Sequence, residues 1–361
     1  MTFLDVRLRR PLARFDLDVE LRLNGGGVTA LTGLSGAGKS RLLQAVAGFD
    51  RAAVGRVQAG ESLWQDDTRG WFVPPHRRRL GYIFQEPFLF PHLSVRRNLL
   101  FGYERVAGGE RRWHPDEVID RLDLAPLLDQ DPADLSGGEK QRLCMGRSLL
   151  TSPRLWLLDE PLSALDPVAR DEVMELMERV FPQLHLPVLY VSHSLKEVGR
   201  LADEVLVMDQ GKIIFQGDLT TASSRADLPL WEREEPGVIC TGIHGGPPDD
   251  WGLCRVETGD ELTLWLPDSG HGQGDRIRLR IAARDVSLSL SPPADSSILN
   301  AIPCTVTAIR PVNASRLIVS LQAPGLPLLA GITRRSCDHL QLKAGTRVHA
   351  LIKSIALADR F

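Results

Sequence analysis

The chain has 361 residues, of which 43% are hydrophobic and 25% charged, and its formal net charge is −3. At roughly 150 residues per domain, this length predicts two or three domains of an ordinary globular protein rather than a disordered or fibrous chain. The small net charge gives no reason to expect nucleic-acid binding. The longest charge-free run, Leu317 to Thr333, contains prolines and glycines and falls short of the ~20 apolar residues of a membrane span. The first ten residues lack the apolar core of a signal peptide.

The cysteines argue against a disulfide or zinc scaffold. They are odd in number, scattered and without a CxxC pair, at Cys144, Cys240, Cys254, Cys304 and Cys337. Such a distribution is typical of reduced thiols in the cytosol.

Strand and helix patterns alternate in the first part of the chain. Residues 2–23 predict two strands, and the apolar run Val28 to Leu31 predicts a third, followed by a Gly-rich loop and a helix over Lys39 to Ala47. Further strands are expected at 80–84, 155–158 and 188–191, and helices near 94–101, 115–128, 137–151 and 167–180. This alternation predicts an α/β domain with a largely parallel sheet covered on both faces.

The amino-acid composition changes after about residue 220. Gly, Pro and Ser become frequent, and short segments such as 276–282, 303–309 and 347–352 predict strands. We therefore expect a domain over 1–222, a linker and β-rich segment over 223–290, and a small all-β domain over 291–361.

Residues 33–40 fit the pattern G-x-x-x-x-G-K-[ST] between a strand and a helix, which is the context of a phosphate-binding loop. Glycines allow backbone N–H groups to surround phosphate oxygens, and the helix N-terminus adds positive potential. Lys39 is expected to reach the β- and γ-phosphates and Ser40 to bind Mg²⁺. The predicted nucleotide-binding residues of this loop are Gly33, Ser35, Gly36, Ala37, Gly38, Lys39, Ser40 and Arg41.

An apolar strand over 155–158 ends in Asp159 and Glu160. Asp159 is placed to hold Mg²⁺, and Glu160 follows directly, where it can polarise an attacking water. Together with the loop, these residues predict a P-loop nucleoside triphosphatase that uses Mg²⁺, and they do not distinguish ATP from other nucleotides.

The segment Leu135 to Arg142, LSGGEKQR, resembles the signature sequence of ATP-binding-cassette proteins. Ser136, Gly137 and Gly138 open a helix, which gives a second N-terminus suited to an anion. The resemblance implies a head-to-tail homodimer in which these three residues cap the nucleotide held by the other copy.

Other family motifs occur in the family's order. Gln85 matches the glutamine that senses Mg²⁺ and water, residues 163–166 match the loop at the dimer seam, and His193 matches the histidine that contacts the γ-phosphate. Two positions depart from the family pattern. Arg41 stands where the family usually has a second hydroxyl residue. Phe15 is the aromatic residue available to stack on adenine. Alternatively, an arginine stacks on adenine, or Phe15 is purely a core residue.

The chain resembles transport cassettes rather than soluble cassette machines, because it has one cassette and no heptad run. The resemblance implies two copies of a separate membrane-spanning permease subunit, and places the protein peripherally on the cytoplasmic face of the cell membrane. In this family the apolar segment 87–95 forms a groove for the permease, although such a segment is also typical of a core.

Residues 284–288 resemble the strand entry of the OB-like, TOBE-type regulatory domains of importer ATPases. Residues 296–300, 331–336 and 340–357 resemble the molybdate-binding Mop domain that ends the ATPase subunit of molybdate importers. That resemblance implies molybdate as cargo, delivered by a periplasmic or extracellular binding protein. It assigns oxyanion-binding positions to Ser297, Asn300, Lys353 and Ser354, while Leu299 replaces an arginine common in the family. Another cargo, such as sulfate, iron or a polyamine, stays open, as does a non-transport cassette that senses anions.

Overall fold

The computed structural model describes residues 2–230, 235–259, 262–268, 270–353 and 355–357. The chain forms two compact units, residues 1–216 and 217–361. Among the described residues, no helix is long and apolar enough to cross a membrane.

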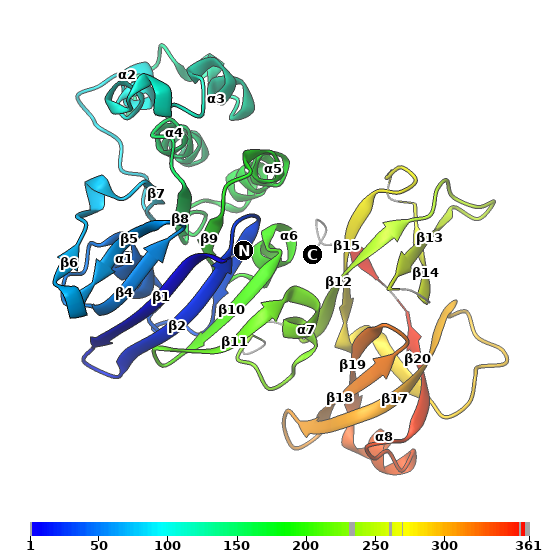
Figure 1. The fold of residues 1–361 in the computed structure, drawn as a ribbon. Helices are drawn as coiled ribbons and strands as arrows, with labels where there is room; N and C mark the ends of the chain where they lie inside the picture. Colours follow the sequence, from blue (N-terminus) through cyan, green and yellow to red (C-terminus); the bar gives the residue numbers. More distant parts are fainter. Residues whose placement is uncertain (1, 231–234, 260–261, 269, 354, 358–361) are drawn as a thin grey trace. The chain divides into compact units, whose positions relative to one another are not determined.

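A six-stranded sheet in the order β11-β10-β3-β9-β8-β7 forms the centre of the first unit (Figure 1). Neighbours from β10 to β7 run parallel, as the sequence predicts. Its strands are β3 (Val28–Thr32), β7 (Leu80–Ile83), β8 (Leu155–Asp159), β9 (Val188–Val191), β10 (Glu204–Asp209) and β11 (Lys212–Asp218).

Both faces of this sheet are covered, because successive side chains of its strands enter different cores. On β8, Trp156 and Leu158 pack in one core with α4 (Gly137–Leu149) and α5 (Pro167–Leu184). Leu155 and Leu157 pack in the other core, with α1 (Lys39–Ala47) and the strands of a second sheet. The expectation of a doubly covered parallel sheet is therefore confirmed.

The second sheet is antiparallel, in the order β2-β1-β4-β5-β6, and the sequence analysis did not predict it as a separate sheet. Its strands are β1 (Thr2–Pro11), β2 (Asp16–Asn24), β4 (Val54–Ala59), β5 (Ser62–Asp66) and β6 (Trp71–Phe72). Strict alternation of buried and exposed residues in β2 gives this sheet one apolar face, which rests on α1.

The helical part of the first unit contains α2 (Val95–Leu100), α3 (Pro115–Arg121) and α6 (Leu195–Leu201) besides α4 and α5. The prediction of one helix over 115–128 is wrong in its second half. Asp123 has a φ of +51°, which ends α3, and Pro126 lies in a separate 3₁₀ turn. A left-handed backbone conformation and a proline both interrupt the α-helical hydrogen-bond pattern.

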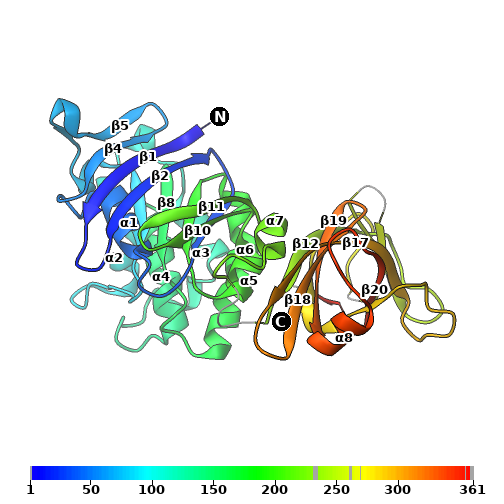
Figure 2. The same cartoon turned by 90° about the horizontal axis from the view of Figure 1, so that it is seen from below.

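The second unit is β-rich, as predicted, and its described residues also form the short helices α7 (Leu219–Ser224) and α8 (Arg334–His339). Two five-stranded sheets, β14-β13-β12-β15-β21 and β16-β20-β17-β18-β19, share one apolar core. Figure 2 shows α8 beside the strands of the second of these sheets. The strands are β12 (Gly237–His244), β13 (Leu253–Thr258), β14 (Leu262–Pro267), β15 (Arg276–Ala282), β16 (Val286–Ser289), β17 (Asn300–Pro311), β18 (Arg316–Ala323), β19 (Leu326–Thr333), β20 (Arg347–Ile352) and β21 (Ala356–Leu357).

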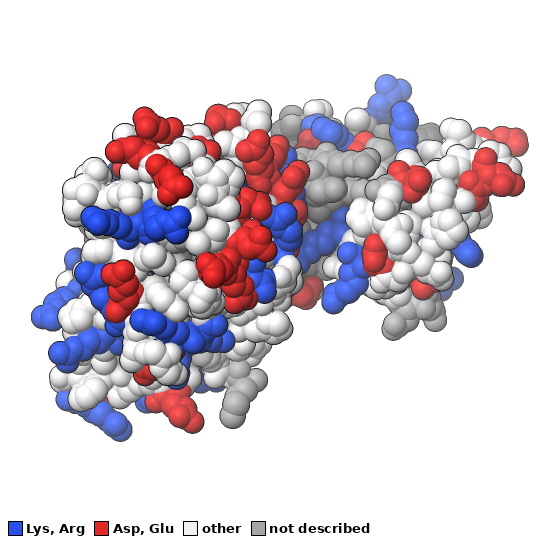
Figure 3. Space-filling model, turned by 90° about the horizontal axis from the view of Figure 1, so that it is seen from above, with Lys and Arg blue, Asp and Glu red and all other residues white. Residues whose placement is uncertain are grey.

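Charged side chains of both signs are interspersed on the first-unit face seen in Figure 3. This mixture agrees with the net charge of −3. All five cysteines are buried and free, and burial raises the pKa of Cys144 and Cys304 to about 11. At neutral pH these thiols are therefore protonated apolar groups.

Candidate functional site

The loop between β3 and α1 takes a conformation that requires glycine at two positions. Gly33 has a φ of +136°, and a Cβ atom there would lie 2.0 Å from the carbonyl oxygen of Met208. Gly38, at the N-cap of α1, has a φ of +105°, and its Cβ atom would lie 3.3 Å from the ring of Phe15. Because side chains are excluded, the backbone of this loop stays open to a ligand at the start of the helix.

Lys39 is 5% exposed, and its ammonium group turns back over the loop. Its Nζ donates to the carbonyl oxygens of Gly33 and Leu34, both at 2.9 Å. The loop therefore holds a buried positive charge beside its own backbone amides, which is the electrostatic setting that a polyphosphate needs.

Asp159, at the end of β8, is 7% exposed. Ser40 donates from Oγ to its Oδ1 at 2.7 Å, and Tyr82 donates from its hydroxyl to its Oδ2 at 3.0 Å. Burial raises the pKa of Asp159, and these two hydrogen bonds partly oppose that shift. Burial and the adjacent carboxylate also raise the pKa of Tyr82, so its hydroxyl stays protonated.

The donor set around Asp159 fits Mg²⁺. Mg²⁺ prefers hard oxygen ligands and is usually bound by one or two carboxylates together with substrate phosphates. Ser40 and Asp159 bring a hydroxyl oxygen and a carboxylate oxygen within 2.7 Å of each other beside the phosphate-binding loop.

Glu160 and His193 meet where β8 and β9 end. The imidazole Nδ1 of His193 lies 3.3 Å from Oε2 of Glu160. Glu160 has a φ of +48°, and its backbone N–H donates to the carbonyl of Val191 at 3.1 Å. A left-handed conformation is costly for a residue with a side chain, so the surrounding structure must hold Glu160 in place.

A cleft of about 480 Å³ lies between the loop and Glu160, and its described lining includes neither Asp159 nor His193. The predicted residues Ser35, Gly36, Gly38, Lys39, Ser40, Arg41 and Glu160 line it, together with Leu12, Ala13, Arg14 and Phe15. The structure thus brings Phe15 to the phosphate-binding loop, and Arg14 beside it is a lining residue that the sequence analysis did not single out.

Gln85 lies two residues after β7, and its side chain is exposed. Since β7 pairs in parallel with β8, Gln85 follows the same sheet edge as Asp159 and Glu160. The role of Gln85 at the metal site stays a prediction.

The signature residues lie elsewhere in the unit. Ser136 is the N-cap of α4 and forms a capping box with Glu139, whose pKa is lowered by the backbone hydrogen bond from Ser136. Ser136 and Gly137 are exposed, while Gly138 packs against α5 near Ala169. None of the three signature residues is among the described residues that line the cleft.

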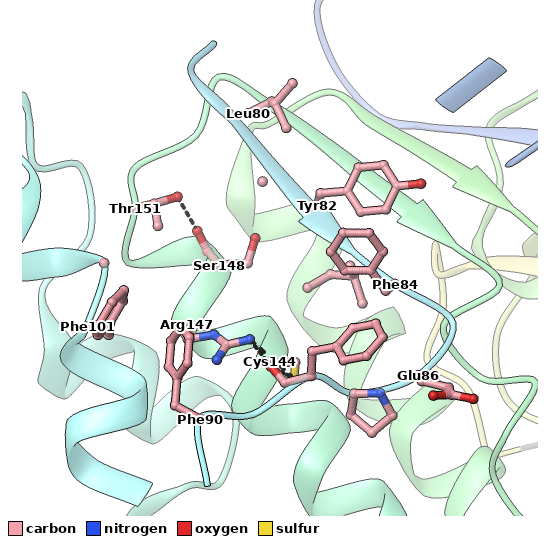
Figure 4. A pocket seen from close by; sticks show the side chains of 15 residues that line it. Leu80, Tyr82, Phe84, Glu86, Phe90, Phe101, Cys144, Arg147, Ser148 and Thr151 are labelled. Carbon is pink, nitrogen blue, oxygen red and sulfur yellow. Dashed lines mark hydrogen bonds between the residues drawn. The ribbon is translucent and has the colours of Figure 1, made fainter. Parts of the chain in front are cut away.

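A second cavity, of about 250 Å³ and with five aromatic residues in its lining, lies beside β7 (Figure 4). Segment 87–95 contributes Pro87, Phe88 and Phe90 to its lining. The guanidinium of Arg147 lies 4.8 Å from the ring centre of Phe90 and donates to the carbonyl of Phe88. We call this cavity the aromatic groove. Its lining residues are Leu80, Gly81, Tyr82, Ile83, Phe84, Glu86, Pro87, Phe88, Phe90, Phe101, Gly102, Cys144, Arg147, Ser148 and Thr151.

The four predicted oxyanion positions lie in the second unit. Ser297 and Lys353 are exposed, and Ser354 lies outside the described residues. Asn300 is already engaged, because its Oδ1 accepts from the Trp265 N–H at 2.8 Å and its Nδ2 donates to the Trp265 carbonyl at 2.9 Å. Asn300 pairs with Ile352 between β17 and β20, so it starts a strand next to the one that leads to Lys353.

A polar cleft of about 590 Å³ in the second unit was not predicted as a site. Its lining includes the basic and hydroxyl side chains of Arg284, Thr333, Arg335, Ser336 and His339. Segments 284–288 and 331–336 carried the family resemblance, but in the sequence nothing shows that they lie side by side.

Comparison with known proteins identifies the family. A family model described as "ABC transporter" matches residues 17–163, and a "TOBE domain" model matches residues 296–358. The chain is 47% identical to the Molybdenum import ATP-binding protein ModC 1 of Azotobacter vinelandii, over 97% of each chain. It is 45% identical to the ModC protein of Pseudomonas aeruginosa, over 99% of each chain. The chain therefore belongs to the family of ABC transporter ATP-binding proteins that includes these two ModC relatives.

The solved structures agree with the fold. The cbiO1 protein of Clostridium perfringens, described as part of the ABC transporter complex cbiONQ, is 28% identical. It superposes with a TM-score of 0.52 over 60% of this chain and 88% of its own. The predicted fold class, an ABC-type α/β ATPase domain followed by an OB-like β domain, is therefore confirmed.

The bonds of Asn300 to Trp265 predict a structural contribution to the second unit. In Asn300→Ala, both main-chain groups of Trp265 lose their partner, which we expect to cost about 1–3 kcal/mol of stability. Thermal unfolding and faster hydrogen exchange in β14 measure this loss. Ser297→Ala, which changes an exposed neighbour, is the control and should leave both unchanged. Unaltered exchange in β14 of Asn300→Ala would contradict the assignment.

Proposed function

We propose that this chain is the ATP-hydrolysing subunit of an ABC transporter that imports molybdate, coupling ATP binding and hydrolysis to conformational change in separate membrane subunits. The observation that carries the proposal is the convergence of the phosphate-binding loop, Asp159, Glu160 and His193 at one sheet edge in a chain 47% identical to a molybdenum import ATP-binding protein.

In the ATP site, Lys39 and the loop amides bind the phosphates. Ser40, Asp159 and Gln85 would hold Mg²⁺, which supplies charge stabilisation for phosphoryl transfer. Glu160 accepts a proton from the attacking water. Its contact with His193 and its fixed backbone conformation hold the Glu160 carboxylate where it can orient that water. His193 donates to the γ-phosphate as negative charge develops there.

The functional unit is a homodimer. Ser136 and Gly137 are exposed at the N-terminus of a 13-residue helix and lie outside the cleft of their own chain. Backbone N–H groups at such a terminus bind anions. A head-to-tail partner would present Ser136, Gly137 and Gly138 to the γ-phosphate and complete each ATP site.

The aromatic groove receives the permease. Two copies of a membrane-spanning subunit, reached by a periplasmic or extracellular binding protein, would hold the dimer peripherally at the cytoplasmic face of the cell membrane. An apolar cavity with the exposed rim residue Phe88 suits an apolar helical segment of such a partner.

Molybdate is the proposed cargo, and the second unit is proposed to bind it. We retain the division into 1–222, 223–290 and 291–361, with Ser297, Asn300, Lys353 and Ser354 as oxyanion residues. A tetrahedral dianion has only acceptor atoms, so its site needs N–H and O–H donors. Sulfate, iron or a polyamine is the alternative cargo, and an anion-sensing cassette without a transporter is the alternative class.

Glu160→Gln is expected to retain ATP binding and to lower kcat about 100-fold or more, because the amide cannot accept a proton from water. The variant should accumulate as an ATP-bound dimer. Phosphate release and size-exclusion chromatography with ATP and Mg²⁺ measure both effects. Hydrolysis near the wild-type rate would show that Glu160 is misassigned.

Complementation between variants tests the composite sites. Ser136→Arg places a bulky side chain where the partner's γ-phosphate would bind, and Lys39→Ala removes a phosphate ligand from its own loop. In a mixed dimer both lesions fall on one site and leave the other intact, so mixing two inactive variants should restore activity. Verified heterodimers with no ATPase activity would contradict independent head-to-tail sites.

Calorimetry of the full chain tests the cargo. We titrate molybdate, tungstate, sulfate and phosphate without nucleotide, and expect heat with molybdate or tungstate that Lys353→Ala reduces. Lys343→Ala, an exposed lysine in the same unit, is the matched control. Binding of sulfate alone would favour the alternative cargo.

A further inference from the structure

Tyr82 connects two regions that the proposed function uses separately. Its hydroxyl donates to Oδ2 of Asp159 at 3.0 Å, and its ring lines the aromatic groove (Figure 4). Of the two described residues that donate a hydrogen bond to the Asp159 carboxylate, Tyr82 lines the groove and Ser40 does not.

The two oxygens of Asp159 are held by different hydroxyl groups. Ser40 bonds Oδ1 and Tyr82 bonds Oδ2. Ser40 is itself a proposed ligand of Mg²⁺, whereas Tyr82 is not. The Tyr82 hydroxyl therefore fixes the rotation of the carboxylate independently of the ligand set, which is how outer partners orient metal ligands.

The ring of Tyr82 is held by neighbouring aromatic side chains. Its centre lies 4.4 Å from that of Phe84 and 5.3 Å from that of Phe49. Phe84 in turn lies 5.5 Å from Phe88, which is 59% exposed. A continuous row of rings thus runs from the solvent-exposed rim of the groove to the buried carboxylate, and close ring packing passes displacement from one member to the next.

We propose that Tyr82 is a positioning residue, whose hydroxyl orients the Asp159 carboxylate toward the metal and whose ring makes that orientation depend on the packing of the aromatic groove. The inference rests on the Mg²⁺ site of the proposed function. It adds a residue that touches neither metal nor nucleotide, and it gives the groove a physical connection to the metal site.

Tyr82→Phe tests the hydroxyl, because it retains the ring. We measure Mn²⁺ affinity by electron paramagnetic resonance in the presence of ATP, with every variant in the Glu160→Gln background to prevent hydrolysis. Mn²⁺ should bind about 10-fold more weakly to Tyr82→Phe, the lower end of the effect of outer-shell partners on metal affinity. ATP binding without metal, measured by calorimetry, should stay unchanged.

Tyr190→Phe is the matched control. Tyr190 is a buried tyrosine on β9 whose hydroxyl donates to Glu197 at 2.6 Å, so its removal costs the same kind of bond at a carboxylate that is not a proposed metal ligand. Its Mn²⁺ affinity should equal that of the Glu160→Gln background. An equal loss in both tyrosine variants would overturn the proposal, since the effect would then be general destabilisation.

Ligand variants separate this inference from the function on which it rests. Ser40→Ala and Asp159→Asn should each weaken Mn²⁺ binding strongly. If they do not, the proposed metal site itself fails. If they do, and Tyr82→Phe binds Mn²⁺ normally, only the inference is overturned.

Phe84→Leu tests the connection to the groove without removing the hydroxyl. It should weaken Mn²⁺ binding when Tyr82 is present and have no further effect in Tyr82→Phe. Equal effects in both backgrounds, or none in either, would overturn the part of the proposal that concerns the ring.

Discussion

A buried carboxylate at the end of a buried strand organises the first unit. All five residues of β8 are buried, and the strand ends at Asp159. An unpaired charge in that position would be strongly unfavourable, so its neighbours must supply hydrogen bonds. Ser40 and Tyr82 do so from the two elements that border the same edge of the sheet, α1 and β7. The hydrogen bonds that compensate this one buried charge thus hold α1 and β7 against the end of β8.

Parallel strand order explains why residues far apart in sequence meet there. The carboxyl ends of β3, β8, β9 and β7 face one edge, and each is followed by a functional segment. Glu160 adopts a strained backbone conformation at that edge, with its N–H bonded to Val191 on the neighbouring strand. Rigid, doubly covered strands can maintain such a conformation, because both faces of β8 are packed.

The residues at this sheet edge can be predicted from the sequence. The loop glycines and Lys39 form one short motif with fixed spacing, and Asp159 and Glu160 are adjacent at the end of a single strand. The helix over Lys39–Ala47 and the strands over 276–282 and 347–352 agree with the structure for the same reason. The antiparallel sheet is harder to predict, because β4, β5 and β6 are short and the pairing of β4 with β1 joins strands that are distant in sequence. Tyr82 was missed because its importance comes from a contact with Asp159, 77 residues away, which no local pattern encodes.

The second unit illustrates the limit of transferring residue roles by resemblance. The amide of Asn300 satisfies both main-chain groups of Trp265 and so joins the two sheets around their common core. The Asn300 side chain must break these hydrogen bonds before it can bind an anion, and the free energy lost lowers its affinity for the anion. The phosphate-binding loop avoids the cost, because its glycine backbone is held open by β3 and α1. Donors that the fold leaves accessible are therefore a better guide to an anion site than matched residue types alone, and the exposed side chain of Lys353 meets that criterion more fully than Asn300.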